Sequence, residues 1–341
     1  MSMFLTVILA VFVFLFIILV HEFGHFVTAK MFHVKVPEFS IGFGPAIFKK
    51  KKGETLYSLR AFPLGGYVQM EGESEASEDE NALCNKPVWQ RMIITVAGAF
   101  LNIVMGFVVF TIIGFMFLNA MPTLKVSRVT ENTPAAQWIC PGDRIVAVNG
   151  YKVWGYDDFR FVLNTANPGE EIKLTVKRNG EKITGDITPE YIEEDGRYRI
   201  GVQMATEKMN LINSFKYGIN QTFFVIKVVF YSLFMLVTGG MSMAGVSGPV
   251  GTVNVMRQAA SHGLGNFLNL FAMLTVNIGI FNLLPIPALD GGRVFFMLIE
   301  LIRRKPIDPK KEGLVHATGL VLLMLFMVLV TVNDISVIFK R

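Results

Sequence analysis

The amino-acid sequence predicts an α-helical polytopic membrane protein with four transmembrane helices. A β-hairpin that re-enters the membrane and one inserted α+β domain outside it complete the expected fold class. Two observations lead to this class. Hydrophobic residues make up 52% of the 341-residue chain, and its mean hydropathy is +0.47, values typical of membrane proteins. Four stretches are also apolar over about 20 residues, the length that crosses the hydrocarbon core.

These stretches divide the chain into eight segments. The four spans are expected at 1–31, 92–120, 269–302 and 314–333. Between them we expect a re-entrant hairpin with an acidic linker at 32–91, the α+β domain at 121–206, an extracytoplasmic membrane-associated region at 207–268 and a basic cytosolic loop at 303–313.

The first span begins as an uncharged run from Met3 to Val20. No basic residue precedes this run and no small-residue cleavage site follows it, so we expect the segment to be retained rather than removed as a signal peptide. The two cysteines, Cys84 and Cys140, fall on opposite sides of the membrane in this scheme, which argues against a disulfide.

Lysine and arginine residues set the orientation. They gather in the loops after the first and third spans, at Lys30, Lys35, Lys49–Lys52, Lys86, Arg91, Arg303, Arg304, Lys305, Lys310 and Lys311. The positive-inside rule places both loops in the cytosol, and both termini and the 120–268 region outside. The net charge of +5 therefore reflects topology, and we expect no nucleic-acid partner.

Residues 222–238 are apolar enough to suggest a fifth crossing. That crossing would move the basic 303–311 loop outside, and the segment is short and carries Lys227. We favour a helix that lies on or partly in the outer face of the membrane.

Two regions between the spans have strand character. Residues 39–48 and 56–70 flank a turn-like Lys-Lys-Lys-Lys-Gly-Glu run and predict a hairpin. Because non-helical backbone near membrane depth needs cover by protein or a water-filled cavity, we expect this hairpin to fold back towards the first span. Residues 122–205 alternate like the strands of a small domain with one helix at 157–166, and Asn-Thr-Pro-Ala-Ala-Gln followed by Pro-Gly-Asp resembles a PDZ domain.

The first span ends in the motif His21-Glu22-Phe23-Gly24-His25. Two histidines four apart on a helix differ by roughly 40° in direction and about 6 Å in rise, so both rings can reach one metal ion. Glu22 lies beside them, where a carboxylate can take a proton from metal-bound water. In the alternative interpretation, the two histidines only point into water at the cytosolic end of the span.

The third ligand is expected at Asp290, in the stretch Asn-Leu-Leu-Pro-Ile-Pro-Ala-Leu-Asp-Gly-Gly of residues 282–292. Pro285 and Pro287 should break the third span there. An ionisable residue at such a place costs on the order of 3 kcal/mol unless it is paired or bound to a metal. Two histidine nitrogens, one carboxylate oxygen and a water would form an open Zn²⁺ site. His33, His262 and His316 have no partner pattern and are expected at the surface or interface.

With these motifs the chain resembles the site-2 proteases, intramembrane zinc metalloproteases, in the bacterial branch that activates sigma factors by cleaving membrane-bound anti-sigma factors. The resemblance extends over nearly the whole chain and is carried by residues 21–25, 39–45, 63–67, 91–102, 247–251, 282–292 and 331–334 together with the single PDZ-like unit.

The resemblance implies roles for particular residues. His21, His25 and Asp290 would bind zinc, with Glu22 as general base. Asn282 matches a position that holds the substrate backbone, with Pro285 and Pro287 in the same stretch, and Asn102 matches a residue near the active site. The hairpin 39–69 would offer a strand edge to an unwound substrate.

The resemblance also implies a bacterial cytoplasmic membrane as location and transmembrane segments as substrates. An anti-sigma factor already trimmed outside the membrane, or a leftover signal peptide, would be cleaved. Two departures from the family pattern stand out. Ala97-Gly98-Ala99 replaces a motif that usually contains proline, which removes no chemical group. The turn Gln137-Trp138-Ile139-Cys140 lacks the usual glycine, so a size filter or a docking surface competes with capture of peptide C-termini.

Two other classes compete with a protease. A metal-binding receptor or inactive scaffold would use the PDZ-like unit for its partners, but the intact Glu22 argues against it. A metal transporter would carry ionisable groups across many spans, whereas here they gather at one site. The sequence does not predict the oligomeric state.

Overall fold

The computed structural model describes residues 2–73, 75, 77–165, 169–192, 197–240 and 248–339. These residues form two compact units, one of residues 1–109 and 225–341 and the other of residues 110–224. Ser247 of the 247–251 motif, residues 74 and 76 of the acidic linker and residue 166 of the predicted helix lie outside the described residues.

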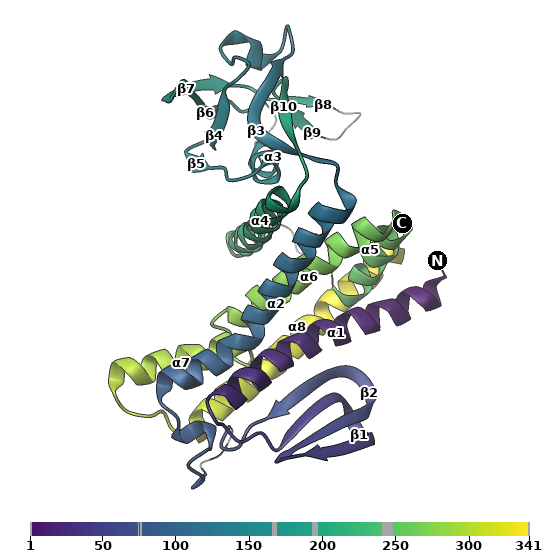
Figure 1. Ribbon diagram of the computed structural model, residues 1–341, viewed down its shortest axis with the longest axis vertical. Coiled ribbons are helices and arrows are strands. Elements are labelled where there is room, and N and C mark those ends of the chain that lie inside the picture. Colours follow the sequence, from purple (N-terminus) through teal and green to yellow (C-terminus); the bar gives the residue numbers. More distant parts are fainter. Residues whose placement is uncertain are drawn as a thin grey trace. The chain divides into compact units, whose positions relative to one another are not determined.

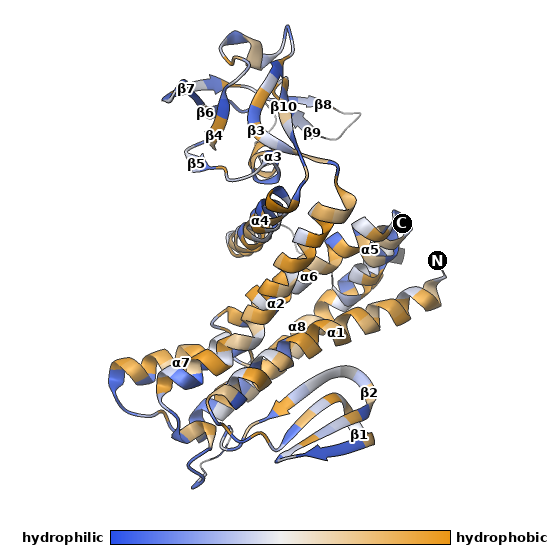
Figure 2. Ribbon diagram, viewed as in Figure 1, coloured by the Kyte–Doolittle hydropathy of each residue, from blue (hydrophilic) through white to orange (hydrophobic). Residues whose placement is uncertain are grey.

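Helices make up most of the first unit (Figure 1). The helices of the chain are α1 (Met3–Met31), α2 (Val88–Phe117), α3 (Tyr156–Asn164), α4 (Leu211–Val237), α5 (Pro249–Ser261), α6 (Leu264–Leu283), α7 (Asp290–Arg303) and α8 (Pro309–Phe339), with short 3-10 turns at Leu83–Asn85 and Pro134–Gln137. Within the described ranges, α1, α2, α4, α6 and α8 are long and apolar enough to cross a membrane, and Figure 2 shows α1 and α2 as apolar along most of their length. The fold is that of a multi-pass membrane protein.

Helix α4 therefore extends well beyond the expected 222–238 segment. It meets the same criteria of length and composition as the four helices that correspond to expected spans. Composition alone thus allows five crossings where the charge pattern predicts four.

Small residues let the spanning helices pack closely. A Cβ built on Gly24 of α1 would lie 2.5 Å from the carbonyl oxygen of Ala97 on α2. One built on Gly279 of α6 would lie 2.8 Å from the carbonyl oxygen of Ala99. Such contacts are typical of helices that pack within membranes, where backbones approach wherever a side chain is missing.

The segment 269–302, expected as one span, is divided into α6 and α7 by a turn at residues 284–289. Pro285 and Pro287 have no N–H to donate and cannot continue α6, which confirms the predicted break. Ala288 has a φ of +78°, a left-handed conformation that costs a non-glycine residue about 1–2 kcal/mol. Asp290 follows as the first residue of α7.

Helix α8 is tied to α5 near the C-terminus. The carboxylate of Asp334 is buried and accepts hydrogen bonds from the backbone N–H groups of Gly248 (3.0 Å) and Gly251 (2.7 Å). A carboxylate at this place complements the free N–H groups and the positive end of the α5 dipole. Helix α5 in turn packs on α1 through Met256.

The hairpin consists of two long strands, β1 (Glu38–Lys52) and β2 (Thr55–Gln69), and lies beside α1 in Figure 1. Both strands bend, so that residues 38–41 pair with 56–59 on one side and with 66–69 on the other, while 49–52 pair with 55–58. The result is a small mixed sheet of four segments whose edges are 46–52 and 62–69, in which 38–41 and 56–59 run parallel and the other neighbours antiparallel. Arg60 fixes the bend: its guanidinium donates to Glu38 Oε1 (2.6 Å) and to the Gly44 carbonyl oxygen (2.7 Å).

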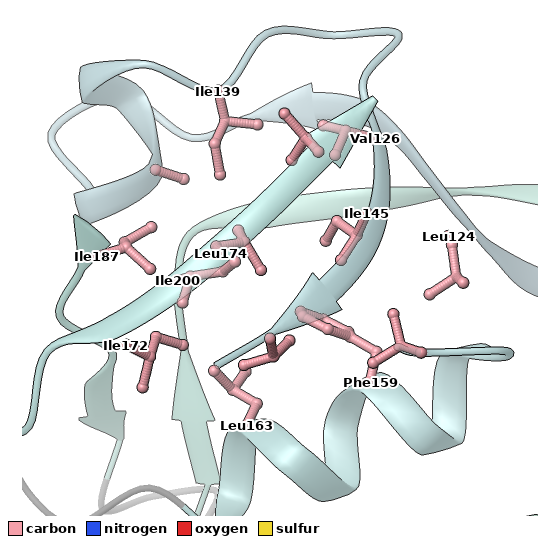
Figure 3. Close-up of a cluster of buried hydrophobic side chains, with 14 residues drawn as sticks. Leu124, Val126, Ile139, Ile145, Phe159, Leu163, Ile172, Leu174, Ile187 and Ile200 are labelled. Atoms are coloured by element: carbon pink, nitrogen blue, oxygen red, sulfur yellow. The ribbon is translucent and has the colours of Figure 1, made fainter. Parts of the chain in front are cut away.

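The second unit contains a β-sheet with the strand order β10-β3-β4-β6-β7. The strands of this unit are β3 (Ala120–Val129), β4 (Arg144–Val148), β5 (Tyr151–Lys152), β6 (Ile172–Arg178), β7 (Glu181–Ile187), β8 (Glu190–Ile192), β9 (Arg197–Arg199) and β10 (Val202–Lys208). Strand β5 pairs with β4, and β8 and β9 form a separate pair. Its core is built from alternate strand residues such as Ile145 and Leu174, with Phe159 and Leu163 of α3 packed against them (Figure 3). The described residues of the predicted segment 121–206 thus combine strands with the helix α3, an α+β arrangement.

Candidate metal centre

Three side chains from α1 and α7 converge on one point in the first unit. Nε2 of His21 lies 3.1 Å from Nε2 of His25, and Oδ2 of Asp290 lies 3.1 Å and 3.4 Å from these two nitrogens. Both histidines are buried. Two of the three residues come from one helix face, and the third begins the helix that follows the proline turn.

This triangle has the dimensions of a zinc site. Ligand atoms about 2.0–2.1 Å from a tetrahedral Zn²⁺ ion lie roughly 3.3 Å apart. The Asp290 oxygen that faces the histidines is buried and has no hydrogen-bond partner, which is costly for a carboxylate. Two imidazole nitrogens and a carboxylate oxygen that face one point fit a divalent cation. Among the described residues, this is the group of histidine and acidic side chains that could hold one.

A hydrogen bond of the second ring nitrogen, Nδ1, fixes the orientation of His25. Its Nδ1 lies 2.8 Å from the carbonyl oxygen of Ile94 on α2 and donates a hydrogen bond to it. That bond leaves the Nε2 lone pair free for a metal, the usual support for a metal-binding histidine. Gly98, one turn further along α2, leaves the space for the ring, because a Cβ there would lie 2.4 Å from His25 Nε2.

Glu22 faces the hairpin. Its Oε2 accepts a hydrogen bond of 3.1 Å from the backbone N–H of Val68, on the edge segment 62–69 of β2. Gly66 of the same segment also approaches it, since a Cβ at Gly66 would lie 3.8 Å from Glu22 Cγ. The strand edge and the candidate general base are therefore direct neighbours.

The other predicted site residues lie on α2, on α6 and on the turn that precedes α7. Asn102 is completely buried in α2, and neither polar atom of its amide has a partner. Asn282 lies in the last turn of α6, and Pro285 and Pro287 form the turn that leads to Asp290. The structure thus places the predicted residues on four helices, α1, α2, α6 and α7, and on the turn between α6 and α7.

Sequence reasoning did not identify Val68, Gly98 or His316 as neighbours of the site. Val68 acts through its backbone N–H and Gly98 through the space beside it, and neither property can be recognised from the residue types in a sequence. The imidazole of His316 accepts a hydrogen bond of 2.9 Å from the backbone N–H of Ala288, although the sequence predicts a surface or interfacial position for it.

A histidine pair and an aspartate at one point, a glutamate beside them and a long apolar helix that carries three of the four define a membrane-bound zinc metalloprotease. The chain belongs to peptidase family M50, whose family model matches residues 9–326. This result confirms the predicted enzyme class and its zinc cofactor.

Bacterial relatives match the chain over nearly its full length. A protein of Clostridium acetobutylicum is 41% identical over 97% of this chain and 98% of its own length. The zinc metalloprotease RasP of Oceanobacillus iheyensis is 31% identical over 98% of this chain and 99% of its own. The regulator of sigma-W protease RasP of Bacillus subtilis is 31% identical with the same coverage.

Among solved structures, the PDZ domain of an SdrC-like protein from Listeria monocytogenes is 23% identical, with a TM-score of 0.23. That match covers 25% of this chain and 88% of the Listeria domain.

Proposed function

We propose that this protein is an intramembrane protease that cleaves the transmembrane segments of membrane proteins already trimmed outside the membrane. The observation that carries the proposal is the triangle of His21, His25 and Asp290 directly after the uncharged apolar run Met3–Val20 of α1. A hydrolytic site at this depth meets its substrate within the bilayer.

Zinc, when bound, lowers the pKa of a coordinated water to about 7 and polarises the scissile carbonyl. Glu22 takes one proton from the attacking water, whose oxygen bonds to the carbonyl carbon. The C–N bond then breaks, and Glu22 passes that proton to the leaving nitrogen. Nδ1 of His25, held by the Ile94 carbonyl, keeps its ring in place throughout.

The edge segment 62–69 of β2 supports a role in substrate binding. A helical peptide bond is shielded by its own hydrogen bonds, so a substrate helix has to unwind before cleavage. An unwound segment can add to this edge as a further strand, next to the Val68 N–H that contacts Glu22. Asn282 and the turn with Pro285 and Pro287 would hold the other side of the extended substrate.

Chain direction supports four crossings. Helices α2 and α6 run antiparallel, because Gly279 packs against Ala99 whereas Ala272, earlier in α6, packs against Gly106, later in α2. The chain therefore leaves the first unit after residue 109 at the end where α6 begins and where α5 packs on α1. One crossing by α4 would put α5 at the opposite end, so the chain between residues 110 and 248 crosses an even number of times. If this part of the chain does not cross at all, the topology satisfies the positive-inside rule and α4 lies on the outer face of the membrane.

In this topology the PDZ-like unit and both termini lie outside the bacterial cytoplasmic membrane. The zinc centre lies towards the cytosolic side, because His25 is only six residues, about 9 Å along the helix, from the end of α1 at Met31. Water can reach the site from that side.

The relatives named RasP suggest the substrate class. One of them is a regulator of sigma-W, which agrees with cleavage of a membrane-bound anti-sigma factor. Leftover signal peptides are apolar segments of similar size and form a second substrate class in the proposal.

The test compares the wild type with Glu22→Gln in membranes that contain a reporter transmembrane segment. Glu22→Gln should retain zinc yet abolish cleavage, whereas Glu78→Gln, in the exposed linker, should retain both. Membrane segments that accumulate with Glu22→Gln would identify substrates. Undiminished cleavage by Glu22→Gln would refute the proposed mechanism.

A further inference from the structure

The turn that carries Asp290 is held by a histidine from another helix. The backbone N–H of Ala288 donates a hydrogen bond of 2.9 Å to Nδ1 of His316, on the second turn of α8. Ala288 is two residues before Asp290 and has a φ of +78°. A residue in this conformation keeps it only where its surroundings enforce it.

The turn has few hydrogen bonds of its own to enforce this conformation. Pro285 and Pro287 have no N–H to donate. Inside the turn, the Ile286 N–H donates to the Leu284 carbonyl oxygen and the Leu289 N–H to the Ile286 carbonyl oxygen. Ala288 is thus the residue through which the turn is hydrogen-bonded to α8.

Helix α8 lies directly against the turn at the same level. A Cβ built on Gly319, three residues after His316, would lie 2.4 Å from Pro287 Cβ and 2.7 Å from its carbonyl oxygen. The imidazole also packs on Phe296 of α7, with ring centroids 5.7 Å apart. His316 is therefore enclosed between the turn, α7 and its own helix.

The hydrogen bond defines the tautomer of His316. Nδ1 accepts from Ala288, so the ring proton belongs on Nε2. Nε2 is buried and makes no hydrogen bond. The nearby carboxylate oxygen Oε1 of Glu312, 3.8 Å away, favours the proton on this nitrogen. A neutral imidazole with this tautomer is a specific acceptor for one backbone N–H.

We propose that His316 is a positioning residue for the zinc centre. By accepting the Ala288 N–H it holds the left-handed turn, and the turn places the Asp290 carboxylate opposite the two histidines of α1. This role rests on the proposed ligation of zinc by Asp290. The role of His316 makes the metal site depend on α8, although all of its proposed ligands lie on α1 and α7.

Substitutions can separate an acceptor from a space-filling ring. His316→Asn places an amide oxygen at nearly the position of Nδ1, His316→Leu fills the space without an acceptor, and His316→Gln moves the acceptor one bond further out. His262→Leu, at the exposed end of α5, is the matched control.

The experiment measures zinc affinity of the full-length protein in detergent by competition with a chelator, and the thermal stability of the zinc-free protein. His316→Leu and His316→Gln should weaken zinc binding about 10- to 100-fold, the usual effect of losing a supporting hydrogen bond. His316→Asn and His262→Leu should stay within about threefold of the wild type, and zinc-free stability should be alike in His316→Asn and His316→Gln.

Two results would overturn the inference. Wild-type zinc affinity in both His316→Leu and His316→Gln would show that the acceptor is dispensable. Equal losses in His316→Asn and His316→Gln would show that only the ring matters. Asp290→Asn, measured in parallel, separates this inference from the proposed function. If Asp290→Asn also binds zinc like the wild type, the proposed ligand set is wrong, and with it the role of His316. If zinc affinity falls in Asp290→Asn and in none of the His316 variants, only the role of His316 is refuted.

Discussion

Gly98→Ala should disable the metal centre although it alters no predicted ligand. The added methyl group would lie 2.4 Å from Nε2 and 2.8 Å from Cε1 of His25, and 2.9 Å from the backbone oxygen of His21. Ordinary contacts of a Cβ begin near 3.4 Å. Either the imidazole moves by roughly 1 Å or α1 and α2 separate by a similar amount.

The size of the effect follows from that displacement. The edges of the ligand triangle are 3.1–3.4 Å long, so a shift of 1 Å is about a third of an edge. Forcing a methyl group into a packed interior costs about 1–3 kcal/mol. If that cost falls on the metal-bound geometry, zinc affinity drops roughly 5- to 150-fold, and proteolysis falls with it at limiting zinc.

The assay is chelator competition on the purified full-length protein, with cleavage of a reporter segment as second readout. Gly106→Ala is the control, because its Cβ would lie 2.3 Å from Val276 Cγ2 and 3.0 Å from the Ala272 carbonyl oxygen. It overpacks α2 against α6, two turns away from the histidines. Gly98→Ala with the zinc affinity and activity of the wild type would refute the described contact with His25.

Two further predictions concern the second unit. Arg178 donates two hydrogen bonds of 2.7 Å to Asp143 and holds the pKa of that carboxyl below its ordinary 3.8. The resulting stabilisation is complete above the ordinary pKa and is lost as pH falls through the lower native value, so the difference in urea stability between wild type and Asp143→Asn should shrink below about pH 4; a constant difference would contradict this. Leu174→Ala, at a fully buried core position, should destabilise this unit by about 2–5 kcal/mol and leave zinc affinity unchanged, as unfolding followed by tryptophan fluorescence and chelator competition would show.

The sequence predicts the parts of the candidate site that depend on residue type. His21 and His25 are four apart on an evident helix, and Asp290 is an acid in a broken span, so each is conspicuous where it stands. The break between α6 and α7 follows from Pro285 and Pro287, and the hairpin from its strand pattern.

The parts that could not be predicted depend on how elements meet. The sequence does not reveal which helix packs against a glycine such as Gly98, because the crossing of α1 and α2 is set by many contacts together. A single histidine on a new helix, such as His316, has no spacing partner. The bends in β1 and β2 escaped prediction for a related reason, since Arg60 pairs with Glu38 across the folded sheet.

The distance along the chain between the two halves of the metal centre has a consequence for biosynthesis. His25 and Asp290 are separated by about 265 residues, which take on the order of 15–50 s to synthesise at about 5–20 residues per second. During that interval α1 and the hairpin have already been made, whereas the third side chain of the proposed site has not. With Asp290 as the proposed third ligand, a newly made chain completes its metal site only once α7 has been synthesised.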